Sequence, residues 1–148
     1  MLKTDNNAAL FFLRLALGTV MFAHGAQKAL GWFGGPGMTK TIEAFTTKMH
    51  FPLPLALLVI AIEFLGSLGL IAGFLTRICA FAIGGSLAIC AFMNHVQNGL
   101  FMNWTGQQKG EGFEFHILAV GIAIALVIKG GGVLSVDRLV AGGGKSRR

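Results

Sequence analysis

Residues 53–75 read LPLALLVIAIEFLGSLGLIAGFL, and Glu63 is the only charged side chain among them. A helix rises about 1.5 Å per residue, so about 20 such residues cross the roughly 30 Å hydrocarbon core of a bilayer. Pro52 and Pro54 stand at the start of the stretch, where missing amide donors cost a helix least. The stretch therefore predicts a transmembrane helix and decides the class of the protein.

Three further apolar stretches, at 8–30, 78–96 and 112–128, repeat this pattern along the chain. The 148 residues are 54% hydrophobic and only 12% charged, whereas a soluble domain has roughly 25% charged residues. Such a composition excludes a disordered chain, a collagen and a secreted disulfide scaffold. We expect an all-α membrane protein, with residues 1–148 forming one domain built as a four-transmembrane-helix bundle.

The basic residues predict the orientation of this bundle. The net charge is +6, but Lys and Arg flank the apolar stretches instead of forming one patch, so nucleic acid is not an expected partner. If both termini are cytoplasmic, seven of these residues face inward and four face outward, which agrees with the positive-inside rule. Residues 139–148 are expected to form a basic flexible tail.

The first outer connection predicts a short interfacial helix. Thr39 is the expected N-cap, and Ile42, Phe45 and Met49 form one apolar stripe at helical spacing. We expect such a helix to lie in the membrane interface.

Polar side chains inside the predicted spans are the main functional signal, because they usually face a bundle interior or a wet cavity. Counted by helical rise, Glu63 lies near mid-membrane and His24 about 9 Å below the outer boundary. Other polar residues fall in the outer third, so we expect one polar pocket in the outer half of the membrane. Its candidate ligand-binding residues are His24, Gln27, Lys28, Glu63, His95, Glu114 and His116.

Side-chain direction favours particular pairs in this pocket. Helical side chains lean toward their own N-terminus, so the heads of His24 and Glu63 approach each other. We therefore rank a Glu63–His24 contact above a Glu63–Arg14 contact, and we expect Arg14 to be a structural charge. Lys28 is a candidate ion-pair partner of Glu114, with a solvated Glu114 as the alternative. The alternative for Glu63 is that it merely ties two helices together.

The sequence does not predict a metal site. Histidine and carboxylate side chains are donors that transition metals accept, but no HxxxH or ExxH spacing places two of them on one helix face. Cys79 and Cys90 are eleven residues apart in one apolar run, about 16 Å along a helix axis. We expect both cysteines to be packing residues.

Several short motifs resemble the DoxX family of small four-span bacterial membrane proteins when they are taken together. They are FAHGAQK at 22–28, GWFGG at 31–35, EFLG at 63–66, GFLTR at 73–77 and EGFEFH at 111–116. The resemblance extends from LRL at 13–15 to SVDR at 135–138, and Ser67 stands where a second glycine after Glu63 is common. It implies a multi-pass protein of the bacterial inner membrane. Relatives include the membrane subunit of a thiosulfate:quinone oxidoreductase and proteins associated with envelope redox stress, while many members have no assigned activity.

Three functions fit these residues, and whether the chain is itself an enzyme stays open. The first is a redox-associated protein that binds a quinone in the polar pocket, with His24, Glu63 and His116 as candidate proton carriers. Its electrons come from an exported partner, since the chain has no haem, flavin or nucleotide motif. The second is a non-enzymatic scaffold or accessory subunit that anchors an exported redox partner. The third is a transporter of small solutes, protons or metal ions, which would need a homo-oligomer.

Overall fold

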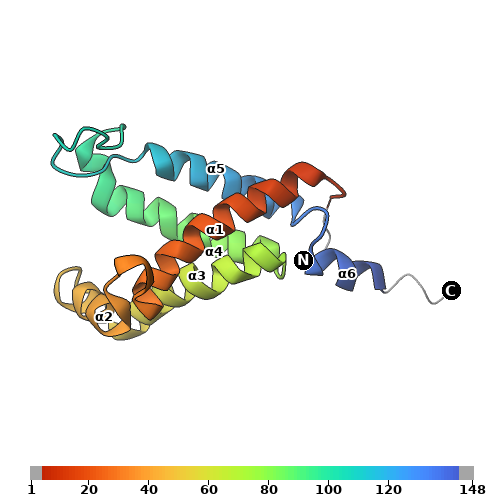
Figure 1. Cartoon of the computed structure of the whole chain (residues 1–148), viewed down its shortest axis with the longest axis horizontal. Coiled ribbons are helices and arrows are strands. Elements are labelled where there is room, and N and C mark those ends of the chain that lie inside the picture. Colours follow the sequence, from red (N-terminus) through yellow and green to blue (C-terminus); the bar gives the residue numbers. More distant parts are fainter. Residues whose placement is uncertain (1–4, 144–148) are drawn as a thin grey trace.

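The structure, a computed structural model, describes residues 5–143, which are helices joined by loops with no strand among them (Figure 1). The helical elements are α1 (Ala8–Leu30), η1 (Trp32–Gly34), α2 (Gly37–Thr47), α3 (Leu53–Ala72), α4 (Thr76–Cys90), the π-helical turn η2 (Ala91–His95), η3 (Val96–Asn98), α5 (Glu114–Lys129) and α6 (Val136–Gly143). The predicted all-α class is confirmed.

Within residues 5–143, three helical segments are long and apolar enough to cross a membrane: α1, α3 and the continuous segment Thr76–Asn98. The fourth predicted span corresponds to α5, which has 16 residues. Large apolar side chains are exposed on the bundle, including Phe81 at 72%, Phe92 at 80% and Leu118 at 69%. An apolar surface of this extent suits lipid tails and not water, so the chain is a membrane protein.

The bundle is a ring of four helices in which α1 packs on α3, α3 on α4, α4 on α5, and α5 on α1. Its apolar core consists of Leu10, Leu17, Met21, Leu70, Ala80, Ile83, Leu87, Ala119, Ala123 and Leu126. Helix α2 packs against α1 and α3. In Figure 1, α2 and the connection 99–113 lie at one end of the bundle, here called the loop end, and α6 lies at the other.

Arg14 holds the α6 end together. Its side chain is fully buried and donates hydrogen bonds to main-chain carbonyls of Leu70, Ile71, Gly131 and Leu134. Leu70 and Ile71 are in the last turn of α3, where carbonyl groups lack partners within the helix. The guanidinium therefore joins α1 to the end of α3 and to the segment before α6.

Asp137 caps the neighbouring helix at the same end. Its two carboxylate oxygens accept hydrogen bonds from the main-chain N–H groups of Leu75 and Thr76, both at 2.8 Å. An acceptor at a helix N-terminus satisfies free donors and interacts favourably with the helix dipole. The α3–α4 turn therefore lies at residues 73–75, where Gly73 takes a left-handed φ of 70°, and not at 76–77, which begin α4.

Two local expectations differ from the structure. Thr39 is not an N-cap, because α2 already begins at Gly37, with Pro36 as its N-cap residue. Residues 139–143, predicted to belong to a flexible tail, are part of α6. The rest of that tail, 144–148, lies outside the described residues.

Candidate functional site

A cavity of about 370 Å³ lies between the helices toward the loop end. Its volume is within the range of small-molecule sites in proteins, about 300–1,000 Å³. Its ionisable lining comes from four different parts of the fold: α1, α3, the α4–η2 segment, and the start of α5 with the residues before it. These lining residues are His24, Lys28, Glu63, Cys90, His95, Glu111 and His116.

Five of the seven predicted ligand-binding residues line the cavity, and Gln27 and Glu114 do not. The Gln27 amide donates to the carbonyl of Phe33 at 3.3 Å, across the turn that follows α1. Oε1 of Glu114 accepts from the main-chain N–H of Met102 at 2.9 Å and from Nε1 of Trp104 at 3.3 Å. These two side chains therefore organise the loops beside the cavity.

Lys28 and Glu63 form an ion pair across the α1–α3 contact, with side chains 27% and 10% exposed. This pair takes the place of both expected pairs, Glu63 with His24 and Lys28 with Glu114. Lys28 follows His24 by one helical turn on the same face, and its long stem allows the ammonium group to reach down to the carboxylate. The carboxylate of Glu63, in the middle of α3, is thus paired with an ammonium group from α1.

Gly25 makes this contact between the two helices possible. A Cβ atom at Gly25 would lie 2.6 Å from the Cα and N atoms of Phe64 and 2.7 Å from the carbonyl carbon of Glu63. No side chain fits there, so the backbones of α1 and α3 touch beside the site. The close approach places Lys28, three residues after Gly25, within reach of Glu63 for the ion pair.

His95 and His116 lie together in the lining of the cavity, with ring centroids 4.4 Å apart. Nδ1 of His95 is 2.9 Å from the carbonyl oxygen of Glu111. Because a carbonyl oxygen only accepts, Nδ1 carries a proton and donates it to this hydrogen bond. His116 is 7% exposed, and its Nδ1 has no hydrogen-bond partner among the described residues. The ring of His24 lies against Phe115, with centroids 6.5 Å apart.

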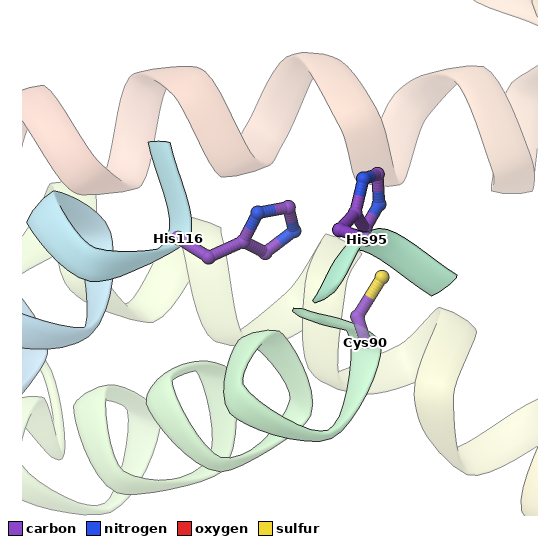
Figure 2. Close-up of side chains that lie close together, drawn as sticks. All are labelled: Cys90, His95 and His116. Carbon is purple, nitrogen blue, oxygen red and sulfur yellow. The ribbon is translucent and has the colours of Figure 1, made fainter. Parts of the chain in front are cut away.

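Cys90 and Glu111 are the functional candidates that the sequence reasoning missed. Figure 2 shows the Cys90 sulfur beside the rings of His95 and His116. The π-helical turn η2 brings Cys90 and His95 together. An apolar stretch of sequence does not predict where such a turn interrupts a helix. Glu111 has a sequence signal, since it opens the EGFEFH motif that also contains Glu114 and His116.

A family model described as DoxX matches residues 9–96, more than half of the chain. The matched segment covers α1 from Ala9 onward and includes α3, α4 and η2, and with them His24, Glu63 and His95, whereas α5 lies beyond it. No curated protein matches the chain significantly, and no solved structure does so. The chain belongs to the DoxX family of membrane proteins.

Proposed function

We propose that this protein is a redox-associated membrane protein whose cavity binds the headgroup of a quinone. One observation carries the proposal: His24, His116 and the Lys28–Glu63 pair, from three helices, line one cavity of about 370 Å³ inside a bundle with an apolar surface. A quinone partitions into the bilayer, where its tail contacts apolar side chains. Its two carbonyl oxygens need hydrogen-bond donors, which ammonium and imidazole groups supply.

The residues of the cavity have the chemistry that quinone reduction requires. Reduction to quinol takes up two electrons and two protons, one proton on each carbonyl oxygen. His24, Glu63 and His116 are the proposed proton carriers, since imidazole and carboxyl groups exchange protons with a bound ligand within hydrogen-bond reach. The electrons are proposed to come from an exported partner protein that carries its own redox centre.

The proposal includes a membrane arrangement. Helix α5 is the fourth span, at about 24 Å for its 16 residues, and both termini are cytoplasmic in a bacterial inner membrane. The loop end then faces outward, and with it α2 and the connection 99–113. The exported partner would bind at this end, next to the cavity.

Equilibrium titration of a short-chain quinone into the purified protein in lipid nanodiscs tests the proposal. The intrinsic fluorescence of Trp32 and Trp104, the two tryptophans of the chain, provides the signal. Replacing His24 or His116 with Ala should weaken binding at least about tenfold, the equivalent of one lost hydrogen bond at about 1.4 kcal/mol.

His50→Ala is the matched control, because His50 is exposed in the connection between α2 and α3. It should bind quinone as the wild type does. Equal affinity in the wild type and in correctly folded His24→Ala and His116→Ala proteins would remove these histidines from the proposed role.

A further inference from the structure

We propose that Cys90, His95 and His116 form a binding site for a zinc or copper ion. The three residues line the cavity described above, but metal binding by them is a separate function that does not depend on quinone binding. Each side chain offers one ligand atom, and the three ligand atoms lie within 4.8 Å of one another. In Figure 2 the sulfur and the two rings lie around a common space between α1, α4 and α5.

The spacing of the three ligand atoms suits a tetrahedral ion. With zinc–sulfur bonds of about 2.3 Å and zinc–nitrogen bonds of about 2.0–2.1 Å, tetrahedral ligand atoms lie about 3.3–3.6 Å apart. The three side chains therefore need to close by about 1.5 Å at most. We expect rotations about side-chain bonds to supply this movement.

One ring nitrogen of His95 is already engaged as in many metal-bound histidines, so a metal ion would bind at Nε2. Its Nδ1–H donates to the carbonyl of Glu111 at 2.9 Å, which leaves Nε2 with a free lone pair. Histidine ligands commonly donate their other N–H to a main-chain carbonyl or a carboxylate, which fixes the tautomer and the ring orientation.

The buried ring of His116 supplies an independent observation. It is 7% exposed, and its Nδ1 has no hydrogen-bond partner in the described part of the chain. A buried nitrogen without a partner costs about 1–3 kcal/mol. The ring is therefore not held in a hydrogen-bond network that would compete with coordination, and it extends toward His95 and Cys90 (Figure 2).

The π-helical turn η2 brings Cys90 and His95 together. Residues five apart in an α-helix point about 140° away from each other, whereas a π-helix closes its hydrogen bonds between residues five apart. Here the N–H of Val96 bonds to the carbonyl of Ala91, five residues earlier. Such single π turns inside α-helices occur frequently at functional sites. Nδ2 of Asn94, in the same turn, lies 3.9 Å from the Cys90 sulfur and can stabilise a thiolate.

The donor set selects the class of ion. A thiolate with two imidazoles favours zinc and copper, whereas magnesium and calcium prefer oxygen ligands. Three protein ligands leave a fourth position toward the cavity, as in zinc sites that bind water or a small ligand. The thioethers of Met21 and Met102 also line this cavity, and thioether donors are among those that copper(I) accepts.

Cobalt(II), a spectroscopic probe for zinc sites, tests the proposal on the full chain purified free of metal in detergent. We expect one cobalt ion per chain and a thiolate-to-cobalt charge-transfer band that zinc displaces and magnesium does not. Cys90→Ala should abolish the band, and His95→Ala or His116→Ala should weaken cobalt affinity at least about tenfold. Cys79→Ala is the matched control, because Cys79 is the only other cysteine, and it should keep the band.

A second measurement needs no variant and so does not depend on the folding of a mutant. In the wild type, zinc should slow alkylation of Cys90 at least about tenfold and leave the rate at Cys79 unchanged, with the two sites separated by peptide mass spectrometry. A missing cobalt band, a band that survives Cys90→Ala, or equal zinc protection of both cysteines would overturn the site. None of these readouts involves a quinone, so they are independent of the proposed function.

Discussion

At the scale of single residues, the ion pair between Lys28 and Glu63 shows what the sequence can and cannot predict. A lone carboxylate in the middle of an apolar helix predicts a polar partner, and the structure provides one. Sequence reasoning chose His24 as that partner, one helical turn from Lys28 on the same face. The choice depends on how closely α1 approaches α3, which Gly25 decides through a contact between backbones. The periodicity of the sequence does not predict the distance between the α1 and α3 backbones.

Removing one partner of this pair should strongly destabilise the fold. Glu63→Gln leaves the largely buried Lys28 ammonium without its counter-charge, so we expect the free energy of unfolding to fall by about 3 kcal/mol. The double variant Glu63→Gln, Lys28→Met removes both charges and should recover part of that loss. Denaturant unfolding in mixed micelles, followed by circular dichroism, measures both values.

The exposed pair between Asp5 and Lys129 is the matched control, with side chains 53% and 57% exposed. Asp5→Asn should change the stability by less than about 1 kcal/mol. If Glu63→Gln were as mild as Asp5→Asn, the Lys28–Glu63 pair would not hold α1 against α3.

At the scale of elements, the apolar runs predict the helices well and their local distortions poorly. The first run was predicted at 8–30 and α1 is Ala8–Leu30. The second was predicted to reach residue 75, but Gly73 adopts a left-handed φ and ends α3 at Ala72. The pattern of apolar residues does not predict the π turn after Cys90. Cys90 was therefore assigned to packing, although it belongs to the same wall as His95 and His116.

The α1–α3 crossing predicts a contrast between two glycine substitutions. Gly25→Ala should lower the free energy of unfolding by about 2 kcal/mol, because the new methyl group would meet the backbone of α3 at 2.6 Å. In Gly121→Ala the methyl group would meet no atom within 4 Å, and its higher helix propensity should stabilise α5 by roughly 0.5–1 kcal/mol. Thermal unfolding of both variants beside the wild type checks the signs. Two variants of equal stability would contradict the close crossing.

At the scale of the whole molecule, apolar composition and charge asymmetry predict a membrane bundle. The fold then brings together residues more than 90 positions apart in the sequence, such as His24 and His116, in the lining of one cavity. Which residues meet is set by the ring order of the four helices and by the non-helical segment before α5. That segment lets Glu111 face the cavity while Glu114 bonds to the connection 99–113. The depths of the polar residues along the apolar runs are enough to predict a polar pocket. They are not enough to place Gln27 and Glu114, which do not line the cavity.

The number of spans predicts where the ends of the chain lie. If α1, α3, the segment Thr76–Asn98 and α5 all cross the membrane, both ends of the chain lie on the same side. With both ends in the cytoplasm, a fluorescent protein fused to either end should fluoresce, and alkaline phosphatase fused to the C-terminus should be inactive. Fluorescent-protein and alkaline-phosphatase fusions in a bacterial host distinguish the two sides of the membrane. An active alkaline phosphatase at the C-terminus, together with a fluorescent N-terminal fusion, would show that α5 does not cross.

Photolabelling with a quinone that carries a light-activated group tests the central claim most directly, namely that the convergent cavity binds a quinone headgroup. After irradiation in nanodiscs, peptide mass spectrometry maps each attachment point. The account predicts attachment within 21–28, 86–95 and 111–116, three separate parts of the chain that line the cavity, and loss of the label when unmodified quinone is in excess. Attachment only to lipid-facing positions such as Phe81 and Leu118, with no competition, would contradict it.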